Sequence, residues 1–314
     1  MGLVTEMAKD IFVLGRSHVY QPSVPSGMAL ADSHAHFDKR LCTDPAKLEE
    51  LVKIIFGSRV DFQAVCDYGF KQGSTPNVIS YSDFIDAIRT RKEVEIVSSD
   101  KYATIARIGD KQIVFTQGRE LETKLEDSKK GFLRDFHDVH IAVEGAEIQA
   151  GMTTYETLRS GEKQNAHMTI AHPFIVPAKK VFFWYANAQE EEDLVQIHED
   201  FPQLYFEGIN SPSTLWMVIN NGRARTFAEQ HNISLIWNSD MHARPHLDIV
   251  RRQIGLAGTV FKQEDLQDLR SLSGKEILDA KYAAIKKNGK GYGNYMSLPL
   301  FYTVMVKPRL FGFE

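Results

Sequence analysis

Short apolar runs alternate along this chain with segments of helical character, and this alternation restricts the fold more than any other feature. Helical segments are expected at Lys47–Phe56, Ser82–Lys92, Glu190–Asp200 and Thr214–Gln230. The apolar runs between them have the length and composition of buried strands: Met28–Ala31, Phe62–Cys66, Gln112–Phe115, Val139–Val143, His167–Ala171, Leu204–Phe206 and Ser234–Trp237. Because strands alternating with helices are typical of parallel sheets, the sequence predicts an α/β fold with a closed or nearly closed TIM-like barrel.

Length and composition fit one such barrel. The chain has 314 residues, of which 43% are hydrophobic and 25% charged, so a single large core is expected. With no repeat or linker visible, we predict one domain over residues 1–314, with a core at about 29–260 and a C-terminal extension packed on it. The stretch from Glu93 to Val114 is expected to contain two β-like runs joined around Gly109-Asp110, a hairpin appended to the barrel.

Charge and cysteine content exclude several classes of protein. The 37 basic and 41 acidic residues give a net charge of −4, which does not indicate a long nucleic acid as partner. Cys42 and Cys66 lie in apolar surroundings and are expected to be buried, inert thiols. No apolar run has the length of a membrane span, and the N-terminus lacks the pattern of a signal peptide, so a cytoplasmic protein is expected.

The residues that bear chemistry follow the expected strands. In barrel enzymes the catalytic groups lie on the loops after each strand, and here metal-binding residue types occupy those positions: His34, His36, Asp67, Glu120, His172, Asp240 and His242. On an extended segment, residues i and i+2 share one face, so both His34-x-His36 and Asp240-x-His242 can grip one ion. Two such pairs at strand exits are hard to obtain by chance.

Further candidates surround these two pairs. Asp67 and Glu120 supply the negative charge that several divalent ions in one pocket require, and Glu207 and Asn210 are expected to orient ligands or substrate. For the fourth expected strand two alternatives stay open from position alone: His140, which begins it, or Glu144 and Glu147 at its end. Four basic residues near the exits are candidates for binding an anionic substrate: Lys39, Arg40, Arg119 and Arg244.

Six motifs occur in a recognisable order: Asp32-Ser33-His34-Ala35-His36, Cys66-Asp67-Tyr68, Gly118-Arg119-Glu120-Leu121, Ala171-His172-Pro173-Phe174, Phe206-Glu207-Gly208-Ile209-Asn210 and Asn238-Ser239-Asp240-Met241-His242. In this order they resemble the polymerase and histidinol phosphatase (PHP) superfamily of metal-dependent phosphoesterases. The stretch from Phe227 to Ile233 is similar to the last helix of that family, and the resemblance covers about residues 30 to 250.

The resemblance implies a distorted (βα)7 barrel that holds two or three divalent ions, with Zn, Mn and Fe fitting the ligand types equally. By position it assigns as ligands His34, His36, Glu120, His140, His172, Asp240 and His242. Two departures concern the third ion. Tyr68 stands where the family usually has histidine, and the ligand expected soon after the first motif has only Asp38 or Asp44 as candidates. Asp44 precedes Pro45 and also fits a helix N-cap.

The expected activity is hydrolysis of a phosphate ester. The ions would lower the pKa of a bound water from about 15.7 toward 7. Glu120 would take part in catalysis as a metal ligand, and Asp67 or His242 would protonate the leaving oxygen. The expected substrate is a small phosphorylated molecule or a short nucleotide. The first motif is also similar to amidohydrolase and TatD-type barrels, and the segment from Val143 to metal dipeptidases. The alternatives are therefore a metal hydrolase acting on an amide or lactone, and a non-catalytic metal-binding barrel.

Overall fold

The computed structural model describes residues 23–69, 77–125, 138–174, 188–210, 215–243, 246–266 and 268–293. These residues form a sheet of eleven strands and a separate pair of short strands. Nine strands follow one another across the large sheet: β10 (Ser234–Asn238), β9 (Tyr205–Asn210), β8 (His167–Ile170), β7 (Asp138–Glu144), β6 (Lys111–Lys124), β3 (Phe62–Gly69), β1 (Met28–Asp32), β12 (Ala257–Lys262) and β13 (Lys290–Gly293).

The remaining strands attach at two places. β4 (Glu95–Ser99) and β5 (Ala103–Ile108) extend the sheet from β6, and all these pairings are antiparallel. β5 and β6 meet at Gly109-Asp110, where Gly109 has a φ of +56°, so the hairpin expected from the sequence is confirmed. β2 (Ala35–Phe37) and β11 (Met241–Ala243) pair in parallel as the separate two-stranded sheet.

The predicted (βα)7 TIM-like barrel is wrong, because the large sheet is mixed. All seven expected strands are present, and parallel pairing joins β1 to β3, β3 to β6, β8 to β9 and β9 to β10. However, β7 is antiparallel to both β6 and β8, and β12 is antiparallel to β1 and β13. A buried apolar run has the same composition in either direction, so the sequence pattern did not reveal the reversal of β7.

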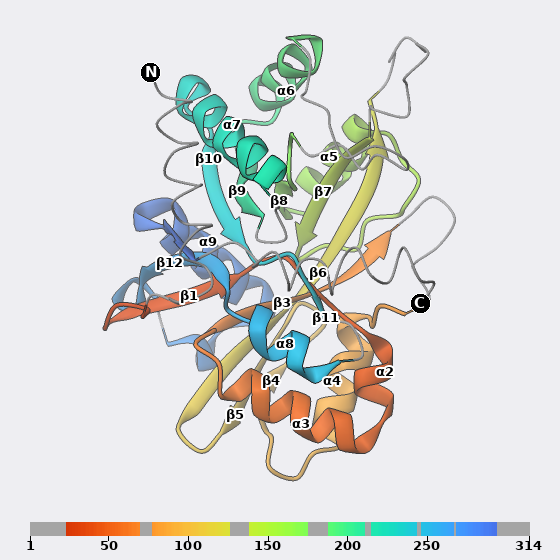
Figure 1. Cartoon of the computed structure of the whole chain (residues 1–314), viewed down its shortest axis with the longest axis vertical. Coiled ribbons are helices and arrows are strands. Elements are labelled where there is room, and N and C mark those ends of the chain that lie inside the picture. The colour runs from red at the N-terminus through yellow and green to blue at the C-terminus, as the bar shows by residue number, and fades with distance from the viewer. Residues whose placement is uncertain are drawn as a thin grey trace.

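The sheet curls until its two ends nearly meet (Figure 1). A side chain joins β10 to β12: the Thr259 hydroxyl accepts a hydrogen bond from the Trp237 N–H at 2.9 Å and lies 3.3 Å from the Trp237 carbonyl. Gly291 of β13 packs so closely on the Trp237 ring that a Cβ there would lie 2.3 Å from it. The barrel is therefore nearly closed by side-chain contacts at this seam.

Helices cover the outside of the sheet (Figure 1). α2 (Lys39–Thr43), α3 (Pro45–Phe56), α4 (Tyr81–Arg89) and α8 (Leu247–Gln253) gather over one part, and α5 (Thr154–Lys163), α6 (Ala188–Asp200) and α7 (Leu215–His231) over another. α9 (Gly274–Asn288) and two short 3₁₀ turns, Gln263–Asp265 and Leu269–Ser271, complete the described elements. Asp44 caps α3 by accepting from the backbone N–H groups of Ala46 and Lys47, so its N-cap interpretation is confirmed.

Apolar side chains fill the space between the helices and the sheet. Phe37, Leu51, Phe84 and Phe115 are fully buried in one cluster, and a second cluster lies under α5, α6 and α7. Cys42 and Cys66 are buried free thiols as expected, and burial raises the pKa of each to about 12. Among the described residues, no helix combines the length and apolar character needed to cross a membrane.

α9 lies against the barrel edge formed by the end of β7 and the start of β8. Its Lys275 donates to the carbonyls of Gly145 and Asn165. His167 at the start of β8 stacks on Tyr282 of α9, with ring centroids 4.0 Å apart, and its Nε2 lies 2.8 Å from Asp279. Burial lowers the pKa of His167 to about 4, although Asp279 acts in the opposite direction.

This pKa predicts how the metal-free protein responds to acid. Below pH 6.5 the unfolded chain gains a proton at His167 that the folded chain takes up only near pH 4, so stability falls across this window. His167→Phe keeps the aromatic stack and should reduce the loss of unfolding free energy between pH 7 and pH 4 by about 1–3 kcal/mol. Urea unfolding in the presence of a metal chelator measures the unfolding free energy at each pH. Equal losses of unfolding free energy in His167→Phe and in the wild type would contradict the expectation.

Candidate metal centre

The two i, i+2 motifs of the sequence lie side by side. β2 carries His36 and β11 carries His242, and parallel pairing places these two residues directly opposite each other. Their ring centroids are 5.1 Å apart. Two segments about 200 residues apart in the chain thus form one face, and the neighbouring His34 and Asp240 turn toward the same place.

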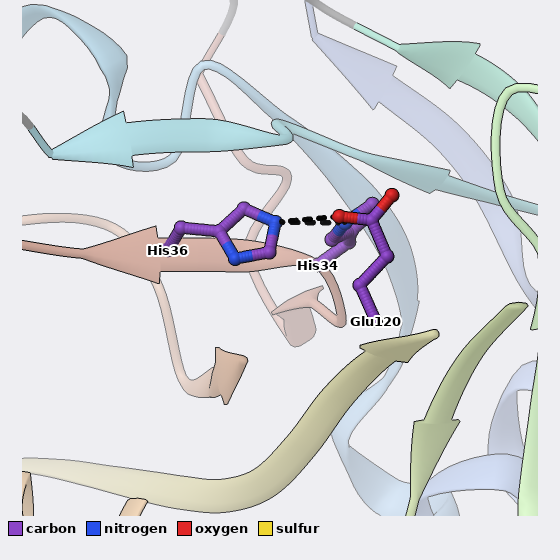
Figure 2. Close-up of side chains that lie close together, drawn as sticks. All are labelled: His34, His36 and Glu120. Carbon is purple, nitrogen blue, oxygen red and sulfur yellow. Dashed lines mark hydrogen bonds and ion pairs between the residues drawn. The ribbon is translucent and has the colours of Figure 1, made fainter. Parts of the chain in front are cut away.

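The first group of donor atoms is compact. Figure 2 shows His34 and His36 pointing at Glu120, which comes from β6. The Nε2 atoms of the two histidines are 3.1 Å apart, and Oε2 of Glu120 lies 3.4 Å from His34 and 3.2 Å from His36. Oδ1 of Asp240 is 3.7 Å from both nitrogens. Metal–ligand bonds of about 2.0–2.1 Å give donor separations of about 3.4 Å in a tetrahedral site, so these four atoms fit around one ion.

Hydrogen bonds behind each histidine turn its Nε2 toward this group. Nδ1 of His36 lies 3.0 Å from the Cys66 carbonyl, which can only accept, so Nδ1 carries the proton. Nδ1 of His34 faces Glu207 at 3.4 Å and donates in the same way. The two Nε2 atoms then face each other at 3.1 Å, so a cation bound between them would take the place of a proton there.

The second group lies on the other side of Glu120. Its Oε1 accepts from Nδ1 of His140 at 2.8 Å and is 3.2 Å from Nε2 of His172. Together these three residues also have the spacing of a metal site. Since Oε2 of Glu120 faces His34 and His36 while Oε1 faces His140 and His172, this carboxylate belongs to both groups.

The reversed direction of β7 explains why His140 lies at the cluster. Because β7 is antiparallel to β6 and β8, its first residues lie at the same barrel edge as the last residues of its neighbours. The alternatives at its other end have different surroundings: Glu144 is buried against Lys281 and Thr116, and Glu147 is exposed. Of the fourth-strand candidates, the structure brings His140 to the cluster.

A third group shares residues with the first. His36, Asp240 and His242 have donors close enough for an ion. Nδ1 of His242 lies 2.9 Å from the Asp240 carbonyl and carries the proton, so Nε2 accepts from the Tyr68 hydroxyl at 2.6 Å. The Tyr68 ring also stacks on His36, with centroids 4.0 Å apart. Tyr68 therefore occupies the Nε2 lone pair of His242.

Two candidate ligands adopt a left-handed backbone conformation. His172 has a φ of +32° and Asp240 a φ of +43°. Such conformations cost on the order of 1 kcal/mol or more in residues other than glycine and cluster at functional sites. The backbone N–H of His172 donates to Glu207 at 2.7 Å, which holds the turn in place.

The buried charges of the centre depend strongly on one another. Burial alone would lower the pKa of His34, but Asp240 and Glu120 outweigh burial and raise that pKa well above its usual value. Burial would raise the pKa of Glu120, yet His34, His140 and His172 lower it well below its usual range. For Asp240 burial prevails and the pKa is raised. The cluster thus favours an anionic Glu120 beside positive charge.

Asp67 is the predicted site residue that the structure does not bring to the cluster. Along β3, Asp67 pairs with Arg119 and Tyr68 pairs with Glu120 in register. Neighbouring residues of a strand point to opposite faces, so Tyr68 shares the inner face with Glu120 while Asp67 lies on the other face. There its Oδ1 is 3.2 Å from Nε of Arg119. The phase of the strand separates these adjacent residues.

The remaining candidates have other contacts. Glu207 holds His34 and His172, and also accepts from Asn238 at 3.2 Å, so it orients ligands as expected. Arg40 pairs with Asp38 at 2.7 Å and Lys39 is exposed. The backbone of Asn210 ends β9, but its side chain lies outside the described residues, as does Arg244.

Sequence reasoning overlooked two buried interactions. Tyr68 was expected only as a missing histidine, although its position two residues after Cys66 on an alternating strand could have placed it on the inner face. Asp32 accepts from the backbone and hydroxyl of Ser239 and so links the two motifs. Burial raises the pKa of Asp32 to about 6.

Comparison with known proteins gives no family for this chain. No protein-family model and no curated protein sequence matches it. The site itself consists of buried His and Glu groups that could hold metal ions.

A substitution of Glu120 tests the shared role of this carboxylate. Glu120→Ala removes a donor from both groups, so zinc affinity should fall by more than the about 10–100-fold typical of losing a residue that only orients a ligand. Asp67→Asn is the matched control, because it changes a partly buried carboxylate on the neighbouring strand β3 without removing a donor from the cluster. Chelator competition and elemental analysis measure both; equal zinc binding by wild type and Glu120→Ala would exclude the shared role.

Proposed function

We propose that this protein is a metal-dependent hydrolase whose centre holds two divalent ions bridged by Glu120, and that it cleaves phosphate esters. The observation that carries the proposal is the position of the Glu120 carboxylate, with one oxygen toward His34 and His36 and the other toward His140 and His172. Bridged pairs of ions are a recurring device in phosphate-ester hydrolysis.

The balance of buried charge supports resident cations. Glu120, Asp240, Glu207 and Asp32 are all buried at or beside the cluster. Within the described part of the chain, Lys281 is the only buried Lys or Arg side chain, and it pairs with a different carboxylate, Glu144. Histidines are then the remaining source of positive charge, and uncompensated buried carboxylates are costly. Divalent ions would supply the missing charge.

Two ions account for the donor atoms better than three. His34, His36, Glu120 and Asp240 suit one ion, and Glu120, His140 and His172 suit the other. The third group would take His36 and Asp240 from the first, and its remaining member, His242, accepts a hydrogen bond from Tyr68. His and carboxylate ligands of this kind suit Zn, Mn or Fe.

The protein groups around the ions have distinct proposed roles. Bound ions would supply Lewis acidity, which would activate water and neutralise the charge that develops on phosphate oxygens. Glu207 fixes the orientation of His34 and the turn at His172. His242 and Tyr68 form a hydrogen-bonded pair at the rim, where the His242 side chain is 20% exposed. This pair can hold a proton for the leaving oxygen, a role for which Asp67 lies on the wrong face of β3.

The order of the candidate ligands along the chain resembles that of the PHP superfamily and supports the proposal. We propose that the chain is a divergent relative in which those ligands persist on a mixed sheet and Tyr68 replaces a histidine. Small phosphorylated molecules or short nucleotides are the proposed substrates. Amides and lactones, which other metal hydrolases cleave, are the comparison substrates in the test below.

Activity should depend on the metal ligands and not on Asp67. We expect hydrolysis of a chromogenic phosphomonoester or phosphodiester by the zinc- or manganese-loaded protein, and a loss of at least about 100-fold in kcat/KM in His172→Ala. Asp67→Asn should retain activity. Steady-state assays run beside amide and lactone substrates decide the class: a fully loaded protein that cleaves only amides or lactones, or cleaves nothing, would refute the phosphoesterase proposal.

A further inference from the structure

Lys281 is buried inside the barrel, although its side chain is charged. It belongs to α9, beyond the segment of the chain whose motifs carry the candidate ligands, and it has no measurable exposure to solvent. Burial of a lysine requires full compensation of its charge and its hydrogen bonds. Its contacts therefore indicate what the residue does.

The ammonium group joins two parts of the barrel. Nζ of Lys281 donates to the Glu144 carboxylate and to the Ser33 hydroxyl, the latter at 3.0 Å. The other Glu144 oxygen accepts from the Thr116 hydroxyl at 3.1 Å. Glu144 lies on β7, four residues after His140, and Thr116 lies on β6, four residues before Glu120. Side chains four residues apart share one face of a strand, so these contacts lie on the same inner faces as the two ligands.

Ser33 immediately precedes His34 and is held through each of its polar groups. Its backbone N–H donates to Oδ1 of Asn238 at 2.9 Å, and its carbonyl accepts from the Cys66 thiol at 3.8 Å. Its hydroxyl accepts from Lys281. Because the residues on each side, Asp32 and His34, are buried as well, the position of Ser33 fixes where the His34 ring enters the cluster.

Stability alone does not explain this ion pair. Replacing a buried pair with apolar groups of similar size is often neutral or stabilising, since the desolvation of two charges offsets their attraction. The Lys281–Glu144 pair instead touches the three chain segments that bear His34, Glu120 and His140. A rigid, fully bonded network beneath metal ligands is known to tune metal affinity.

We propose that Lys281 is a positioning residue of the metal centre: from α9 it holds Ser33 and Glu144, and through them the segments that carry His34 and His140. This inference rests on the proposed metal centre. It gives the C-terminal segment of the described chain a part in the site, because the ligands alone would be held less rigidly than with α9 docked.

The test compares zinc affinity with thermal stability in three variants of the full chain. Ser33→Ala removes the link between Lys281 and the His34 segment and leaves the ion pair intact; its zinc affinity should fall about 10–100-fold at a nearly unchanged Tm. Lys281→Met/Glu144→Gln removes both charges together, so the fold survives while zinc affinity falls similarly. Lys287→Met, an exposed lysine of the same helix that pairs with Asp265, is the control and should match wild type.

The outcomes separate this inference from the proposed function. Chelator competition with Zn²⁺ alone gives the affinities, and circular dichroism gives Tm. Wild-type zinc affinity in both Ser33→Ala and the double variant would overturn the positioning role and leave the metal centre intact. Recovery of wild-type affinity in the double variant alone would also overturn it, because Lys281 would then only compensate Glu144. A wild-type protein that binds no zinc would refute the centre and this inference together.

Discussion

The rest of this structure depends on the contacts that the two carboxylate oxygens of Glu120 make with histidines. One oxygen faces His34 and His36 and the other faces His140 and His172, so four histidines from three chain segments converge on one buried carboxylate. Such a cluster is stable only where every charge is compensated. Glu207 and the Cys66 carbonyl accept hydrogen bonds from the Nδ1 atoms of His34 and His36, which face away from the cluster. The proposed ions would supply the remaining positive charge.

The mixed direction of the sheet serves this convergence. If β7 were parallel to β6 and β8, its first residues would lie at the opposite barrel edge and His140 would be remote from Glu120. Reversal instead brings His140 beside Glu120 and directs Glu144 toward α9, where it pairs with Lys281. One strand therefore supplies a candidate ligand at one end and an anchor for the C-terminal helix at the other.

Much of this could be predicted from the sequence, and the failures have physical causes. Strand positions and the ligand candidates could be predicted because apolar runs and i, i+2 spacing are local properties of the sequence. Strand direction could not be predicted, because an apolar run such as Val139–Val143 has the same composition in both directions. The predicted (βα)7 barrel was therefore wrong. The phase of β3 was also missed: Asp67 has the more common ligand chemistry, but pairing in register with Glu120 puts Tyr68 inside. The burial and contacts of Lys281 could not be predicted, because its partners are distant in the chain.

The most direct test of the central claim is a crystal structure of the zinc-loaded protein with anomalous diffraction at the zinc edge. The account predicts two anomalous peaks about 3.5–4 Å apart, one among His34, His36 and Asp240 and the other beside His140 and His172, with the Glu120 carboxylate between them. A single peak, a pair that Glu120 does not bridge, or no peak in this cluster would contradict it.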